Sequence, residues 1–133
     1  VSLGTAGRLL CSHGSPRSYD DIIVATTPDE EIDSMIAGNE AEMYAGGHTH
    51  RRMLRAHRGH EIVNPGSVGL AYQFLADGSV RVPAWAEFAI LSASDEGAVS
   101  VDFRRIPYDR DATVRAMIER EMPHAAWWSA NWR

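Results

Sequence analysis

Three short apolar runs in the first half of the chain, each ended by turn-forming residues, predict β-strands. Glycine, proline or asparagine follows each run and predicts a loop at the carboxyl end of the strand. The runs cover residues 7–11, 42–45 and 61–63. Open sheets commonly bind their ligands at the carboxyl ends of strands, so these three loops are the first places to look for chemistry.

A helix is predicted between the first two strands. Thr27 is expected to be its N-cap and Pro28 its first helical residue, and acidic residues fill the first turn. Apolar residues then recur at helical spacing until Gly38 and Asn39 end the helix. These apolar residues are Ile32, Met35 and Ile36.

The second half of the chain predicts a hairpin followed by a helix. Residues 87–91 form an apolar run, and residues 99–104 alternate apolar with polar as a half-buried strand does, with a hairpin loop at 94–97. Residues 109–122 carry an apolar helical face, and the aromatic tail at 126–132 is expected to pack back on the core. The predicted fold class is therefore α/β, with mixed β-sheets and flanking helices.

Composition and charge exclude several classes of binding partner but identify none. The chain has 133 residues, which suits one domain, and its 18 acidic residues outnumber 13 basic ones, all arginine, for a charge of −5. This charge predicts no general attraction to nucleic acid or anionic lipid, and no apolar run is long enough to predict a membrane span. The single cysteine excludes an internal disulfide framework and fits a reducing, cytoplasmic location.

The strongest chemical signal is Gly-Gly-His-Thr-His at residues 46–50. Two histidines two positions apart in an extended segment project to the same side, and imidazole is a ligand for divalent transition metals. His48 and His50 therefore form a candidate metal site. The alternative is that both are ordinary polar residues of a turn, because a two-residue motif is weak alone.

A second loop, residues 11–16, carries His13 where the first predicted strand ends. His13 is either a third imidazole ligand or a residue that caps the strand by hydrogen bonds. Cys11 lies on the same side of this strand, so a Cys/His nucleophile pair is an alternative. We interpret Cys11 instead as a small packed apolar residue, because no third orienting residue is evident. The third loop, Asn64 to Gly69, is a strand-to-turn segment that alone predicts only structure.

Taken in order, Ser-His-Gly-Ser-Pro, Gly-Gly-His-Thr-His and Asn-Pro-Gly-Ser resemble the calcineurin-like metallophosphoesterase superfamily, and most closely its small bacterial and archaeal phosphodiesterase and phosphatase branch. The resemblance implies a four-layer α/β/β/α sandwich of two mixed sheets. It also implies hydrolysis of a phosphomonoester or phosphodiester substrate by a two-metal mechanism. His13 and His48 would bind one divalent ion and His50 the other, the ions being Mn, Fe, Zn, Ni or Mg.

The chain departs from this family in what precedes His13. The family motifs Asp-x-His, Gly-Asp and Gly-Asn-His do not occur there, so we expect residues 1–133 to be the C-terminal portion of a single metallophosphoesterase domain. No catalytic residue is then expected in this chain. Three neutral imidazoles without a carboxylate predict partial or no metal occupancy and an inactive chain, while the complete protein would be the enzyme. The acidic residues Asp20, Asp21 and Asp33 are interpreted as turn, helix-start and solvated residues.

Two further expectations concern the surface. Four arginines follow the Gly-Gly-His-Thr-His loop and either steer an anionic substrate or, as we interpret them, form a solvated surface. They are Arg51, Arg52, Arg55 and Arg58. The alternative to an enzyme is a non-catalytic scaffold or protein-binding module with the same fold. In either case an uncovered sheet edge predicts self-association or pairing with the missing N-terminal half.

Overall fold

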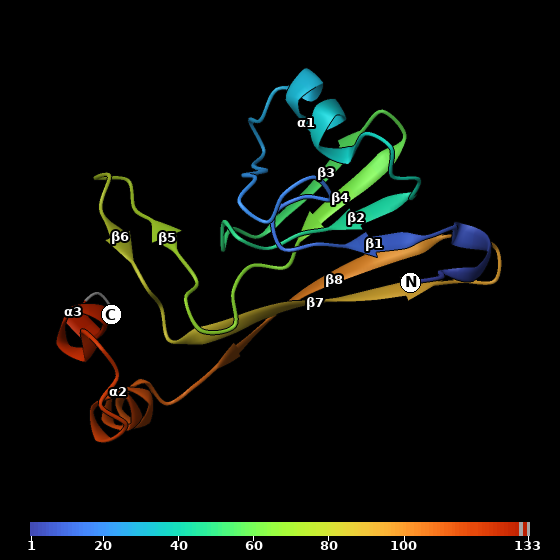
Figure 1. Ribbon diagram of the computed structural model, residues 1–133. Helices are drawn as coiled ribbons and strands as arrows, with labels where there is room; N and C mark the ends of the chain where they lie inside the picture. The colour runs from blue at the N-terminus through green and yellow to red at the C-terminus, as the bar shows by residue number, and fades with distance from the viewer. Residues whose placement is uncertain (131, 133) are drawn as a thin grey trace.

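The computed structural model describes residues 1–130 and 132. In it, a four-stranded sheet brings the three predicted loops together at the end of the sheet where its parallel strands finish (Figure 1). Its strand order is β1-β2-β4-β3, with β1, β2 and β4 parallel and β3 antiparallel to β4. The strands are β1 (Leu9–Cys11), β2 (Met43–Ala45), β3 (Met53–His57) and β4 (His60–Asn64). Because β1, β2 and β4 are parallel, their carboxyl ends meet at the same edge, and the loops that follow them lie together.

Helix α1 (Asp29–Ile36) covers this sheet and forms the main core with it (Figure 1). Ile32 is fully buried and packs in one cluster with Tyr44 of β2 and Ile62 of β4. The helix begins one residue later than predicted, so Pro28 occupies the N-cap position that we expected for Thr27. The Thr27 hydroxyl instead accepts a hydrogen bond from the Val24 N–H at 2.9 Å, which closes the turn before the helix.

A two-stranded antiparallel ribbon runs alongside this unit (Figure 1). It consists of β7 (Trp85–Ala93) and β8 (Val99–Pro107), and both strands extend beyond the predicted 87–91 and 99–104. The predicted hairpin loop is confirmed, with the Gly97 N–H donating to the Ser94 carbonyl at 3.0 Å. The ribbon is joined to the turn after β4 by a hydrogen bond from the Glu87 N–H to the Ser67 carbonyl, at 2.9 Å.

The remaining elements lie at the end of the ribbon away from α1 (Figure 1). They are the short hairpin β5 (Gln73–Phe74) and β6 (Val80–Arg81) and the helices α2 (Arg110–Glu119) and α3 (Ala125–Ala130). The 3-10 turn η1 (Gly4–Ala6) lies instead at the other end of the ribbon, beside its hairpin loop, where the Thr5 hydroxyl donates to the Asp95 carbonyl at 2.9 Å. The helix predicted over 109–122 is shorter because Glu121 has a positive φ of 52°. In the tail, Trp132 is buried beside Val82 as expected, whereas Trp127 is 62% exposed; residue 131 lies outside the described residues.

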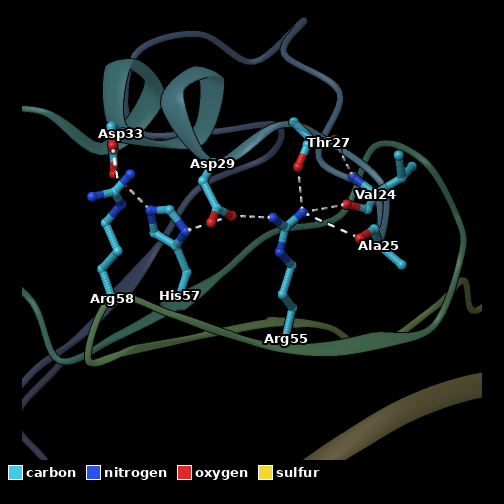
Figure 2. A network of polar contacts seen from close by, with 8 residues as sticks. All are labelled: Val24, Ala25, Thr27, Asp29, Asp33, Arg55, His57 and Arg58. Atoms are coloured by element: carbon cyan, nitrogen blue, oxygen red, sulfur yellow. Dashed lines mark hydrogen bonds and ion pairs between the residues drawn. The ribbon is translucent and has the colours of Figure 1, made fainter.

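The interpretation of the arginines as a solvated surface is wrong for Arg55, as Figure 2 shows. The Arg55 guanidinium donates to the carbonyls of Val24, Ala25 and Thr27 and pairs with Asp29 at 2.6 Å. This side chain is only 16% exposed. Arg55 therefore anchors the loop before α1 to β3. This role was missed from the sequence because no strand was predicted at β3.

The same network corrects the interpretation of Asp33 as a solvated residue (Figure 2). One Asp33 carboxylate oxygen lies 2.8 Å from Nε2 of the buried His57, and the other lies 3.2 Å from Nε of Arg58. The other ring nitrogen of His57 lies 3.3 Å from Asp29. Two carboxylates of α1 and two basic groups of β3 and its turn thus hold the helix on the sheet.

Candidate metal centre

The structure brings His13 and His48 into direct contact. Nδ1 of His48 lies 3.2 Å from Nε2 of His13, and the ring planes meet at 72°. His13 follows β1 and His48 follows β2, and the Gly47 N–H donates to the His13 carbonyl at 2.6 Å. Two imidazole nitrogens bound to one tetrahedral zinc ion, each at about 2.0–2.1 Å, lie roughly 3.3–3.4 Å apart. The observed separation therefore fits two ligands of one ion.

His50 is positioned separately. Its Nδ1 lies 3.0 Å from the Leu70 carbonyl oxygen, so Nδ1–H donates there and Nε2 keeps its lone pair for a ligand. The Tyr72 ring stacks on the imidazole at 5.7 Å between centroids. A carbonyl partner of this kind is the usual orienting contact of a metal-binding histidine. Within residues 1–130 and 132, no group of three or more His, Cys, Asp or Glu side chains is arranged to hold an ion, so His50 does not join the other pair.

The histidine loop has a strained backbone. His48 and His50 have φ values of 57° and 54°, the left-handed region that residues with a Cβ seldom adopt. Such a conformation costs on the order of 1–3 kcal/mol per residue and persists where surrounding contacts impose it. The loops also pack backbone to backbone, because a Cβ added at Gly46 would lie 2.9 Å from the Gly14 carbonyl oxygen. The close approach of these two backbone segments thus explains why glycine stands at position 46 of the motif.

Asn64 joins the histidine loop, residues 46–50, to the turn that follows β4. This residue is 3% exposed and ends β4. Its Nδ2 donates to the Gly47 carbonyl at 2.6 Å and to Oγ1 of Thr49 at 3.0 Å, and its Oδ1 accepts from the Gly66 N–H at 2.9 Å. Sequence reasoning treated Asn64 only as part of a turn. The signal that could have identified it is an amide side chain at the end of a central strand, facing a loop that carries histidines.

The loop that carries His13 has its own support. Ser15 is buried, and its hydroxyl donates to Asp21 at 2.5 Å. Arg17 forms two hydrogen bonds to the same carboxylate, at 3.0 and 2.8 Å. The Arg17 guanidinium, and after it the Ser15 hydroxyl, hold the pKa of Asp21 below its ordinary value. Asp21 is therefore engaged in shaping the turn, as the sequence predicted, and not in the metal site.

Two other sequence interpretations have different outcomes. Cys11 is exposed, so its interpretation as a packed apolar residue is wrong; β1 lies at the edge of the sheet and leaves this side chain uncovered. Arg51 and Arg52 are exposed directly after His50, and their guanidinium groups lie over the rings of Phe74 and Phe103 at 4.9 and 5.5 Å. These two positive charges remain at the surface of the candidate site, unlike Arg55.

Comparison with known proteins identifies the fold. The sequence matches no family model and no curated protein. The structure resembles a hypothetical protein from Pyrococcus horikoshii with a TM-score of 0.69 at 19% identity, over 93% of this chain and 45% of that one. It resembles a metallophosphoesterase from Sphaerobacter thermophilus with a TM-score of 0.65 at 21% identity, over 94% and 55% of the two chains. For Vps29 from Entamoeba histolytica the TM-score is 0.49 at 20% identity, over 82% and 59%.

The first two of these comparisons bear on the fold alone, since both identities are below 25%. The chain spans about half the length of the two solved structures that it matches best among these. The described residues contain no helix with the length and apolarity to cross a membrane. The predicted fold class is confirmed: the chain has a mixed α/β fold with several sheets and flanking helices, and this architecture resembles that of the Sphaerobacter thermophilus metallophosphoesterase.

Proposed function

We propose that this chain supplies metal ligands for the hydrolysis of a phosphomonoester or phosphodiester. His13 and His48 would bind one divalent ion and His50 a second. The observation that carries the proposal is the 3.2 Å approach of the His13 and His48 nitrogens at the loop edge of a metallophosphoesterase fold. Bound divalent ions would neutralise phosphate oxygens and lower the pKa of a bound water. Imidazole donors favour manganese, iron, nickel or zinc over magnesium.

The residues of the chain then have distinct tasks. Nε2 of His13 and Nδ1 of His48 are the donors on one side, and Leu70 orients His50 so that its Nε2 faces away from the carbonyl contact. Asn64 keeps the histidine loop in its strained conformation. The exposed guanidinium groups of Arg51 and Arg52 attract the anionic substrate.

We also propose that the complete site takes carboxylate ligands from outside this chain. Three neutral imidazoles leave the charge of two divalent ions uncompensated, and the chain spans about half the length of the structures that it matches. The partner would be an N-terminal half or a second chain pairing along β1, which is the edge strand of the sheet. The isolated chain would then hydrolyse little substrate. Its single cysteine supports a cytoplasmic location.

One observation favours the alternative of a non-catalytic protein-binding module. Large apolar side chains are exposed over the ribbon and the short hairpin, among them Phe74 at 57% and Ile106 at 54%. Exposed apolar side chains that form a contiguous patch mark surfaces that bind other proteins. A scaffold of this kind would bind its partner without metal, whereas the enzyme requires metal for turnover.

An activity assay on the protein assembled with its partner separates these functions. The substrates are p-nitrophenyl phosphate and bis-p-nitrophenyl phosphate, with Mn²⁺, Ni²⁺ or Zn²⁺. We expect turnover that His48→Asn abolishes and His124→Asn leaves unchanged, because His124 is exposed and lies between α2 and α3. No turnover with any of the three metals, or equal turnover by His48→Asn, would contradict the proposed hydrolysis.

A further inference from the structure

Two neighbouring apolar hollows lie between the segment after β4 and the tail helices. Their volumes are about 130 Å³ and 270 Å³, and Leu70 and Trp128 line both. Tyr72 lines the smaller hollow, and Met117 and Met122 line the larger one. We call these two hollows together the apolar trough. No sequence pattern indicates this trough, because its walls come from four separate segments of the chain.

The trough is in direct contact with the candidate metal centre. Leu70, which lines both hollows, accepts the hydrogen bond from Nδ1 of His50 at 3.0 Å. Tyr72, which lines the smaller hollow, stacks on the His50 ring with an angle of 15° between the planes. The two residues that orient His50 therefore also form the wall of the trough. The trough therefore borders the His50 ring on the side of Nδ1 and on the face that Tyr72 covers.

The chemistry of the trough selects a flat, apolar group. Its walls are aromatic and aliphatic, and Met117 and Met122 are flexible enough to adapt to a ring. The smaller hollow, at about 130 Å³, is close in size to an apolar cavity of about 150 Å³ that binds benzene. Arg51 follows His50 in the chain and is exposed, and its guanidinium lies over the Phe74 ring at 4.9 Å. A molecule with an anionic end and an aromatic end fits the juxtaposition of histidine, arginine and trough.

We propose that the apolar trough binds the organic group of the substrate, which is therefore a phosphate ester carrying an aromatic ring. This inference rests on the proposed phosphoesterase function, because it takes a divalent ion bound at His50 to hold the phosphate end. The aromatic ring replaces water along Leu70, Tyr72 and Trp128. The trough thus sets which alcohol portion of the ester is preferred, while the histidines act on the phosphate.

The test compares phenylphosphonate with methylphosphonate, which share the anionic end and resist hydrolysis. Binding to the full chain is followed in the presence of Zn²⁺ by NMR of ¹³C-labelled methionine methyl groups. We expect phenylphosphonate to bind about tenfold more tightly, from burial of one ring, and to shift the methyl signals of Met117 and Met122. The methyl signals of Met35 and Met43, buried in the main core, are the internal control. Equal affinity of the two phosphonates, or unshifted Met117 and Met122 signals, would overturn the proposal.

A variant pair and a third probe make the result independent of the metal site. Met117→Glu places a charge in the trough and is expected to remove the preference for phenylphosphonate, whereas Ile118→Glu, on the same helix and 64% exposed, is expected to keep it. Phenol without metal should shift the same methionine signals. Shifts with phenol but no Zn²⁺ binding would contradict the metal site and support the trough as an aryl site. Zn²⁺ binding without any preference for phenylphosphonate would support the metal site and contradict the trough as an aryl site.

Discussion

The helix-covered sheet, residues 9–64, and the C-terminal region, residues 73–130 with 132, differ in how they bury their side chains. In the sheet, Ile32 is fully buried, and Tyr44 and Ile62 are each 3% exposed. Among the described residues of the C-terminal region, the buried large apolar side chains are Val82 and Trp132, while Ile118 is 64% exposed. The residues of the candidate metal centre thus lie on the well-packed region. The trough, which we propose to bind the organic group of the substrate, is formed partly by the weakly packed region.

Buried polar groups show the same contrast. In the helix-covered sheet, Asn64 and His57 are buried and hydrogen-bonded. In the part of the chain that the structure describes, the buried side-chain polar atoms with no partner all belong to the C-terminal region: Trp85 Nε1, Tyr108 Oη and Trp132 Nε1. Burial alone raises the pKa of the Tyr108 hydroxyl. A buried polar atom without a partner costs free energy, so the C-terminal region is the less stable part.

The largest expected effect tests the packing side of this comparison. Ile32→Ala leaves a cavity under α1 and should lower the free energy of unfolding by about 3 kcal/mol. Ile118→Ala on α2 removes an exposed side chain and should change it by less than about 0.5 kcal/mol. Urea denaturation of both variants measures the difference. Equal losses would mean that the two regions are packed alike.

A smaller effect is expected where the metal loops join the sheet. Asn64→Ala removes two donated hydrogen bonds and one accepted bond at a buried site, which should cost about 2 kcal/mol of unfolding free energy. It should also weaken Zn²⁺ binding, measured by calorimetry, because the strained histidine loop loses its support. Asn39→Ala is the control, since its side chain makes one local hydrogen bond outside these loops. Unchanged Zn²⁺ affinity in Asn64→Ala would contradict its role in holding the loop.

Two tyrosines test whether the regions differ in how well their buried polar atoms are hydrogen-bonded. Tyr44→Phe removes a buried hydroxyl that donates to the Asn39 carbonyl at 2.6 Å and should cost about 1 kcal/mol. Tyr108→Phe removes a hydroxyl without a partner and should be nearly neutral or slightly stabilising. Both are conservative changes of the same kind, measured by urea denaturation. A larger loss for Tyr108→Phe would show that its hydroxyl has a partner after all.

The smallest effect concerns acid stability of the α1 anchor. Arg55, and to a lesser degree His57, hold the pKa of Asp29 below its ordinary value of 3.8. A carboxylate whose pKa is lowered on folding stabilises the protein above its unfolded pKa, and this contribution disappears as the pH falls through the lowered folded value. Wild type should therefore be more stable than Asp29→Asn at pH 6, and the difference should shrink as the pH falls below 3.8 and vanish below the lowered pKa of folded Asp29. A difference that persists in acid would point to a cause other than this ion pair.

The three loops that carry the candidate ligands could be predicted from sequence because short local patterns, an apolar run followed by turn residues, mark where each strand ends. Strands ending at Cys11, Ala45 and near Val63 follow from short apolar runs, and parallel pairing then places His13 beside His48. The strand at Met53–His57 was not predicted because its arginine and histidine residues look solvated in sequence. Their partners, Asp29 and Asp33, lie more than twenty residues away on α1, a distance that no local pattern spans.

The trough was not predicted, and the role of Asn64 was missed, for a similar reason. Leu70, Met117 and Trp128 come together only through the path of the ribbon and the tail, which hydrophobic periodicity does not specify. The two-residue strands at Gln73–Phe74 and Val80–Arg81 are too short to leave a pattern. Asn64 acts through hydrogen bonds to a loop fifteen to seventeen residues earlier. Tertiary contacts, and not propensity, decide each of these features.

The most direct test of the metal centre is a Zn²⁺ titration followed by NMR of the histidine ring nitrogens. The 3.2 Å contact predicts that the His13 Nε2 and His48 Nδ1 signals shift together, at the same metal concentration, as both nitrogens bind the same ion. The exposed His124 and the buried, carboxylate-bound His57 should keep their signals at that concentration. Independent shifts of His13 and His48, or a shift of His124 at equal or lower metal concentration, would contradict a shared ion.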